Sequence, residues 1–183
     1  MNSGPLCPLH LRQITAPDDV TAELRQALTA CWIEVTNAGG AAGFPFPPID
    51  AGQAAPAVDS LVAGLARETS RLVIASIDGD LAGWLNVRRD PFELIAHWGT
   101  LHHVQTRTSL RGRGIGAALM HHVREIARDE MGLEQLHLAA RGGVGLEDFY
   151  GRLGWKEIGR WPGALRLAPG DDRDEVLMML APL

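Results

Sequence analysis

The sequence predicts an α/β fold with one mixed sheet, and three observations favour it. Two apolar runs flank Asp78-Gly79-Asp80, which is a strong hairpin signal. A strand-like run that ends at Thr106 is followed at once by a glycine-rich loop and a helical pattern. Strand and helix patterns alternate along the rest of the chain, so we expect the element order β-α-α-β-β-β-α-β-α-β-β.

The first third of the chain predicts one strand and two helices. Leu9–Ile14 alternates apolar and polar residues, as a strand does, and Val20–Val35 repeats apolar residues at helical spacing. Gly39–Pro56 is rich in glycine, alanine and proline, so we expect it to form no regular element. A shorter helix is expected at Ala57–Arg67.

The middle of the chain predicts three strands. Leu72–Ile77 and Leu81–Val87 form the hairpin around Gly79. Arg88–Trp98 is a connector in which one helical turn would pair Glu93 with His97. Thr100–Thr106 is the third strand.

The last third predicts two helices and three strands. Apolar spacing gives a helix over Gly114–Met131, which Gly132 would end. Further elements are expected at Gln135–Ala140 (strand), Leu146–Leu153 (helix), Trp155–Arg160 (strand) and Glu175–Leu180 (strand), with a turn-rich Pro162–Asp174 between the last two. No internal repeat is present, so we expect residues 1–183 to form a single domain.

Composition limits the class of function. The net charge of −5 and the pI near 5.8 argue against a nucleic-acid partner, and no apolar run is long enough to span a membrane. No secretory signal pattern opens the chain, and Cys7 and Cys31 are isolated thiols, so we expect a cytoplasmic protein. The histidines and cysteines lack ligand spacing, so we expect no metal.

The stretch from Arg111 to Ala117 combines glycines, two arginines and a helix start. Free N–H groups and the positive end of the helix dipole meet there, which favours binding of a phosphate-like anion. A Walker-type loop needs GxxxxGK[ST], which is absent. Gly112-x-Gly114-x-x-Ala117 does match a dinucleotide fingerprint, but too little chain follows for that fold, and Arg141 stands where it requires an acidic residue.

The same stretch resembles a signature of the GNAT acetyltransferase superfamily. Arg111-x-x-Gly114-x-Gly116 is similar to the R/Q-x-x-G-x-G/A motif, and Leu146–Trp155 is similar to the family's hxhaYxxhGF segment, with Trp155 in place of the phenylalanine. The resemblance implies a GNAT fold, with one central mixed, mostly antiparallel sheet flanked by about four helices. It implies acetyl-CoA as acyl donor, and the residues expected to bind this cofactor are Val104, Gln105, Thr106, Arg111, Gly112, Arg113, Gly114, Ile115, Gly116, Ala117 and Tyr150.

The resemblance also suggests how protons move. Tyr150, the only tyrosine, occupies the position of the family's general acid. Strand alternation places His102 on the same face as Val104 and Thr106, so His102 is our candidate base. A β-bulge in this strand would exchange the roles of His102 and His103, and ordered water is the alternative base.

The acceptor is the least constrained part of the prediction. In GNAT proteins the connection between the first two helices often covers the acceptor pocket, so we expect Phe44 and Phe46 to bind the substrate. Trp32, Glu93 and His97 are further expected substrate-binding residues, and Glu93 and His97 are also a second candidate pair for the base. Arg141–Gly145 would shape the pocket from the other side. We expect N-acetylation of a primary amine of a small molecule, with an aminoglycoside-like antibiotic as one candidate and therefore a role in antibiotic resistance. A protein or peptide amine, or an acyl-CoA-binding module without turnover, is the alternative, and a homodimer is expected by family analogy.

Overall fold

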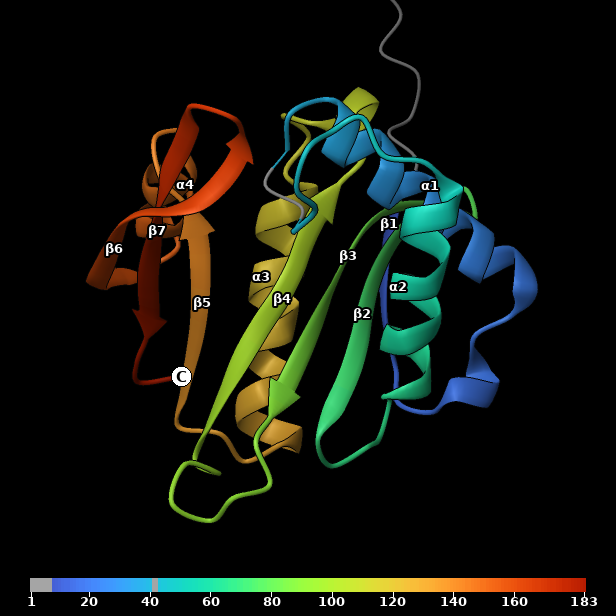
Figure 1. Cartoon of the computed structure of the whole chain (residues 1–183). Coiled ribbons are helices and arrows are strands. Elements are labelled where there is room, and N and C mark those ends of the chain that lie inside the picture. Colours follow the sequence, from blue (N-terminus) through green and yellow to red (C-terminus); the bar gives the residue numbers. More distant parts are fainter. Residues whose placement is uncertain (1–7, 41–42) are drawn as a thin grey trace, which may run out of the picture.

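The fold is built on one seven-stranded sheet with the order β1-β2-β3-β4-β5-β7-β6 (Figure 1). This is a computed structural model, and it describes residues 8–40 and 43–183, so Cys7 lies outside the described residues. The elements are β1 (Leu9–Ile14), η1 (Pro17–Asp19), α1 (Ala22–Asn37), α2 (Ala51–Ala63), β2 (Ser70–Ile77), β3 (Asp80–Arg89), β4 (Trp98–Thr106), η2 (Thr108–Leu110), α3 (Ile115–Glu125), η3 (Ile126–Glu130), β5 (Gln135–Arg141), α4 (Leu146–Arg152), β6 (Lys156–Ala168) and β7 (Asp171–Leu180).

The sheet is mixed and mostly antiparallel, as predicted. Every neighbouring pair of strands runs antiparallel except β4 and β5, which are parallel. One apolar core packs α3 and α4 against one face, and it contains Leu119 and Tyr150. A second core packs α1 and α2 against the other face around Trp32 and Trp84. The sheet therefore has helices on both faces, and the strands between them are largely buried.

Helix α2 begins earlier than the sequence predicted. We expected no regular element before Ala57, but α2 starts at Ala51 and carries Pro56 inside it. A capping box at Asp50 and Gln53 explains the early start: each side chain bonds to the main chain of the other residue. A proline in this place costs one helical hydrogen bond, and the cap together with the buried apolar face offsets that loss.

The C-terminal hairpin is longer than predicted. The segment from Pro162 to Asp174 was expected to be turns, but β6 runs to Ala168 and β7 starts at Asp171. Register shifts interrupt the pairing of these strands, for example between Trp161 and Leu165. The bulges accommodate Pro162 and Gly163, because a residue without a ladder bond is tolerated there.

The predicted helix over Gly114–Met131 has two parts. The α-helix α3 ends at Glu125, and a π-helical turn, η3, continues to Glu130. Glu130 there receives hydrogen bonds from Arg71 and Gln13, which ties the end of the helix to β1 and β2. Gly132, with φ 63°, ends the segment as predicted.

In the described residues, the helices are all too short or too polar to span a bilayer.

Candidate active site

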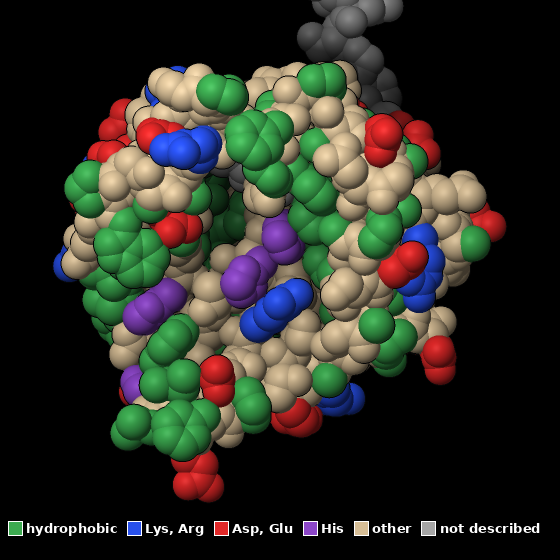
Figure 2. All heavy atoms as spheres, viewed as in Figure 1, with side chains coloured by type: hydrophobic (Ala, Val, Ile, Leu, Met, Phe, Trp, Pro, Cys, Tyr) green, Lys and Arg blue, Asp and Glu red, His purple; other side chains and the backbone are tan. Residues whose placement is uncertain are grey.

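A cavity opens where β4 and β5 separate. The two strands pair only from Trp98–Gln135 to Thr100–His137 and then diverge, as Figure 1 shows. The cavity between them measures about 770 Å³. Its walls come from the ends of β4 and β5, the start of α3, helix α4, the α1–α2 connection and strand β6. Figure 2 shows this face of the molecule hollowed, with histidine side chains gathered beside the hollow.

The start of α3 forms one wall of the cavity. Gly112 and Gly114 have φ of 77° and 79°, a conformation that glycine adopts without strain, and both leave open space where a Cβ would stand. Gly116 lies close to the Phe149 ring, with 3.3 Å from a built Cβ to the ring. The first N–H groups of α3 have no intrahelical partner and lie beside this open space. The structure therefore offers a main-chain cradle that fits a diphosphate.

Of the predicted cofactor-binding residues, all but one line the cavity. Those on the wall are Val104, Gln105, Thr106, Arg111, Gly112, Gly114, Ile115, Gly116, Ala117 and Tyr150. The Arg113 side chain is exposed and lies outside the wall, so only its main chain and its charge can contribute there. Their roles toward a cofactor stay predictions.

The loop before α3 is anchored to α1 by a carboxylate that the sequence did not reveal. Glu34 accepts hydrogen bonds from the Thr108 N–H at 2.6 Å, from the Thr108 hydroxyl and from Arg107 at 2.8 Å. Burial raises the pKa of Glu34, but these hydrogen bonds outweigh it and hold the pKa below its usual value. Glu34 therefore fixes the position of the glycine-rich loop.

Strand β4 contains a bulge at the cavity. Gln105 pairs with Trp84 and His102 with Asn86, so His103 and Val104 together lie opposite Leu85. The extra residue shifts the alternation of side chains that we assumed. His103, with φ 57°, lies on the cavity wall, and His102 does not. The prediction that His102 faces the cavity beside Val104 is therefore wrong, and the bulge alternative describes this strand.

His103 is packed among aromatic rings. Its ring centroid lies 4.5 Å from that of Trp32 and 5.9 Å from that of Trp84. Desolvation, helped by the nearby positive charges of His102 and Arg88, lowers the pKa of His103 to about 4. The imidazole is therefore neutral at pH 7 and can accept a hydrogen bond or a proton.

Tyr150 reaches the cavity from α4. Its side chain is 5% exposed and packs against Phe149 and Trp155. Burial raises the pKa of Tyr150 to about 12, so the phenol keeps its proton at neutral pH. Tyr150 can therefore donate a hydrogen bond to a group bound at this wall of the cavity.

The α1–α2 connection covers the other end of the cavity, as predicted. Phe44 lies on the wall and packs edge-on against Trp32 at 5.1 Å. Trp32 itself is 3% exposed and lies behind the wall, so its predicted place on the pocket surface is wrong. Phe46 does not line the wall either: its side chain is 54% exposed, because its N–H bonds to the Leu167 carbonyl and turns the residue outward. Its predicted place on the pocket wall is wrong.

Glu93 and His97 are far from the site. Both are exposed residues of the turn between β3 and β4. This turn lies at the N-terminal end of β4, whereas the cavity lies at its C-terminal end. Neither lines the cavity, and the segment forms turns instead of a helix. Their predicted place beside the substrate is wrong, because the part of β4 from Trp98 to His102 separates them from the bulge.

Two polar side chains on the wall are buried and lack hydrogen-bond partners, which the sequence did not predict. Arg141 ends β5 and is 9% exposed, and Gln105 on β4 is 2% exposed. Within the described chain, the Arg141 Nε and both polar atoms of the Gln105 amide are buried without a hydrogen-bond partner. Each such group costs about 1–3 kcal/mol when it is left unsatisfied, so a water molecule or a ligand is expected as their partner.

Metal ligation finds no support in the part of the chain that the structure describes. Residues 8–40 and 43–183 contain no cluster of three or more His, Cys, Asp or Glu side chains that could hold a metal ion.

Comparison with known proteins fits this geometry. The acetyltransferase (GNAT) family profile matches residues 23–155. Solved structures share the fold over nearly the whole chain. A candidate phosphinothricin N-acetyltransferase has a TM-score of 0.77 at 17% identity, covering 95% of this chain and 98% of its own. The ribosomal-protein-alanine N-acetyltransferase of Brucella melitensis has a TM-score of 0.71 at 20% identity, covering 94% and 99%.

A third solved structure holds coenzyme A. It is an aminoglycoside 6'-N-acetyltransferase complexed with coenzyme A, with a TM-score of 0.69 at 15% identity, covering 94% of this chain and 96% of its own. The sheet, the separated strands and the glycine-rich helix start define an acyltransferase of the GNAT type. The chain belongs to the GNAT acetyltransferase family.

Proposed function

We propose that the protein transfers the acetyl group of acetyl-CoA to a primary amine of a small molecule. One observation carries this proposal: a single cavity is lined by the glycine-rich start of α3, the bulged end of β4, Tyr150 of α4 and Phe44 of the α1–α2 connection. A donor and an acceptor can therefore meet inside it.

The coenzyme end would be held by main-chain groups. The N–H groups from Gly112 to Ala117 would bind the diphosphate, and Arg111 adds positive charge on the same wall. Acetyl-CoA supplies an acyl group activated as a thioester. Beyond Thr100, the edge of β4 that faces β5 has no strand partner, so its peptide groups can pair with an extended pantetheine arm.

Two side chains are placed to handle protons. Tyr150 holds a proton at its phenolic oxygen and would donate it toward the departing sulfur. His103, which takes the place proposed for His102, would accept a proton from the acceptor amine, directly or through water. Because the pKa of His103 is near 4, it is a weak base, and an ordered-water route is the competing mechanism. The N–H beside Val104 would stabilise negative charge on the acyl oxygen.

The cover over the acceptor end favours a small acceptor. The Phe46 N–H bonds to the Leu167 carbonyl at 3.2 Å, and Arg141 bonds to the Gly39 carbonyl, so the α1–α2 connection is tied to β6 and β5. A peptide would need this connection to move aside. An aminoglycoside-like acceptor is the first antibiotic to test, although the wall residues include three arginines, namely Arg111, Arg141 and Arg166, and a single carboxylate, Glu175.

The test is release of free coenzyme A thiol from acetyl-CoA with an amine panel. The panel contains aminoglycosides, polyamines, amino sugars and amino acids, and peptides with N-terminal or lysine amines. We expect at least one small-molecule class to exceed every peptide by tenfold or more in kcat/KM. Thiol release with peptides alone would overturn the small-molecule acceptor, and coenzyme binding without any release would overturn turnover itself.

A homodimer through the C-terminal strands stays part of the proposal. Strand β6 is the edge of the sheet, and Ile158 and Trp161 on it are exposed apolar side chains. Such a surface is a common site of association. Sedimentation of the wild type and of Trp161→Arg tests this, since only a dimer through this edge would dissociate in the variant.

A further inference from the structure

We propose that Arg141 and Gln105 form a carboxylate subsite in the cavity, so that the acceptor is a small amine bearing a carboxylate, of the amino-acid type. This inference rests on the proposed acetyl transfer to a small amine and names the acceptor class. The evidence for the subsite is the burial and the hydrogen bonding of Arg141 and Gln105.

Arg141 is a buried cation that lacks a counter-ion. Its guanidinium donates to the Gly39 carbonyl through Nη2, while Nε is buried without a partner in the described residues. Glu175 is its neighbour across the β5–β7 ladder, yet no ion pair joins them. Desolvation and the nearby charge of Arg173 lower the pKa of Arg141, and the charge of Asp171 opposes this shift without reversing it. An anion from outside would satisfy this group.

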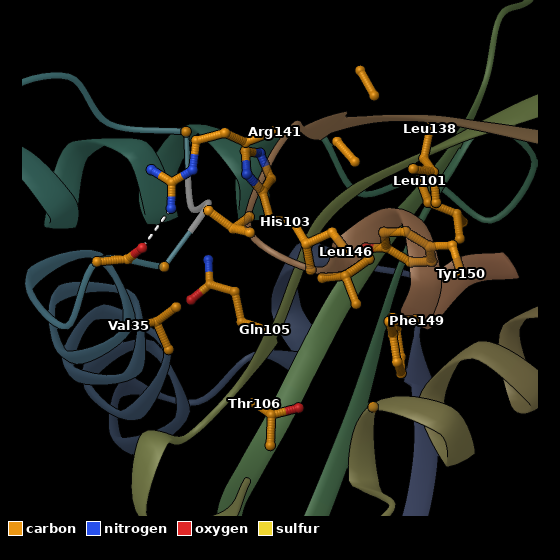
Figure 3. A pocket seen from close by; sticks show the side chains of 18 of the residues that line it. Val35, Leu101, His103, Gln105, Thr106, Leu138, Arg141, Leu146, Phe149 and Tyr150 are labelled. Atoms are coloured by element: carbon orange, nitrogen blue, oxygen red, sulfur yellow. Dashed lines mark hydrogen bonds between the residues drawn. The ribbon is translucent and has the colours of Figure 1, made fainter. Parts of the chain in front are cut away.

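Gln105 presents a second unsatisfied group to the same space. Both ends of its amide are buried without a partner in the part of the chain described. Figure 3 shows the Gln105 amide and the Arg141 guanidinium pointing into one part of the cavity, from β4 and β5 respectively. The amide N–H₂ can donate to one carboxylate oxygen while the guanidinium binds through its planar fork.

The position of the pair assigns the anion to the acceptor and not to the coenzyme. Arg141 contacts Gly39 of the α1–α2 connection, which covers the acceptor end. The cradle for a diphosphate lies at the start of α3, where Arg111 supplies the charge. In Figure 3 Tyr150 lies at the opposite side of the view from Arg141. A molecule that spans this distance would bring its amine to the thioester and its carboxylate to Arg141.

The other arginine at this end does not compete for the anion. Arg166 on β6 is paired with Asp172 through two hydrogen bonds, of 2.7 and 2.9 Å. Arg141 is therefore the cation at the acceptor end that is free to bind a carboxylate. A polycationic acceptor would instead be repelled by it.

The experiment compares matched acceptors. Thiol release is measured with L-amino acids, with their carboxamides and with the corresponding amines that lack the carboxyl group. We expect wild-type kcat/KM to favour the carboxylate-bearing member by at least tenfold. Arg141→Gln should abolish this preference by lowering kcat/KM for the amino acid at least tenfold, while kcat/KM for the carboxamide and the coenzyme A dissociation constant stay within about twofold.

Controls separate local recognition from general charge or folding effects. Arg128→Gln removes an equal charge from an exposed, Asp129-paired residue of η3, away from the cavity, and should keep the preference. Gln105→Met, which keeps the size of the side chain, should weaken the preference without abolishing it. If Arg141→Gln fails to fold, Arg141→Lys provides the comparison. A wild-type kcat/KM preference for the carboxylate-bearing acceptor in Arg141→Lys would contradict the contact through two guanidinium N–H groups.

A binding measurement keeps the inference independent of turnover. In the presence of coenzyme A, calorimetric titration with an N-acetylamino acid should give at least tenfold tighter binding than titration with its amide. Equal binding would overturn the carboxylate subsite and would assign the unsatisfied groups to ordered water. An active enzyme with no carboxylate preference overturns only this inference, whereas an inactive enzyme overturns the proposed function.

Discussion

The two ends of the cavity are built in different ways. At the start of α3, consecutive residues from Gly112 to Ala117 offer main-chain groups, and every second residue is a glycine. At the other end, side chains from the α1–α2 connection, β4 and β5 meet, among them Phe44, His103 and Arg141. A continuous main-chain site can be read from a short motif, whereas a site assembled from distant side chains depends on the fold. The coenzyme end should therefore tolerate side-chain changes and be sensitive to backbone changes, and the acceptor end should respond in the opposite way.

The largest effect is expected where the two ends meet, at Tyr150. Tyr150→Phe removes the phenolic proton but keeps the ring in its apolar contacts. Because a positioned acid contributes about 10²–10⁴-fold, we expect kcat to fall by about a hundredfold. Coenzyme A affinity, measured by calorimetry, should be unchanged. Unchanged turnover would remove Tyr150 from the role of acid.

A backbone change should break the coenzyme end. Gly114→Val places a β-branched residue at φ 79°, which costs on the order of 1–2 kcal/mol and displaces the first N–H groups of α3. We expect the dissociation constant of coenzyme A to rise by roughly ten- to thirtyfold. Gly79→Val is the matched control, since Gly79 also has positive φ and open space but lies in the distant β2–β3 turn. An equal loss of coenzyme affinity in both variants would contradict the cradle.

Acid should lower the free energy of unfolding through His103. In the folded state the pKa of His103 is about 4, below the value near 6.5 expected when the chain unfolds. The folded protein thus binds fewer protons than the unfolded chain between these values, so the contribution to stability is present above about pH 6.5 and is lost as the pH falls toward 4. Between pH 7 and pH 5 we expect about 1–2 kcal/mol of the unfolding free energy to be lost through this group.

Urea unfolding at the two pH values checks this. His103→Gln should reduce the loss by about 1–2 kcal/mol relative to the wild type. An identical loss in the variant would show that the buried imidazole is not responsible.

The smallest effect concerns the anchor of the glycine-rich loop. Glu34→Gln removes the charge that holds Thr108 and Arg107. Because hydrogen bonds to a charged group contribute roughly 1.5–3 kcal/mol and glutamine retains part of them, we expect the KM for acetyl-CoA to rise about threefold to tenfold with kcat nearly unchanged. Asp59→Asn, which breaks the exposed Arg25–Asp59 pair, should change neither constant. A fall in kcat alone would indicate that Glu34 acts on the reaction and not on the loop.

Local patterns predicted most of the fold. The β2–β3 hairpin, β1 and α4 depend on short-range signals, such as alternation and turn residues. The residue ranges predicted for them lie within one residue of the observed elements or inside them. The early start of α2 was missed because the glycine, alanine and proline content of Gly39–Pro56 predicts no regular element, whereas the Asp50–Gln53 capping box begins the helix at Ala51. The full length of β6 was missed because bulges let a strand continue through Pro162, which sequence alone does not reveal.

The site divides in the same way. The glycine-rich motif and the Tyr150 segment predicted residues that do line the cavity, since each is a contiguous stretch. His103 depended on a bulge that shifts the alternation of β4, and Arg141 and Glu34 depended on contacts between residues far apart in the chain. Glu93 and His97 were misplaced because local spacing says nothing about which end of a strand faces the cavity.

The most direct test of the account is a crystal structure of the protein with coenzyme A. The account predicts the diphosphate within hydrogen-bond distance of the N–H groups between Gly112 and Ala117, and the sulfur between the bulge of β4 and the Tyr150 hydroxyl. A diphosphate bound elsewhere, or held by side chains while these N–H groups face water, would contradict it.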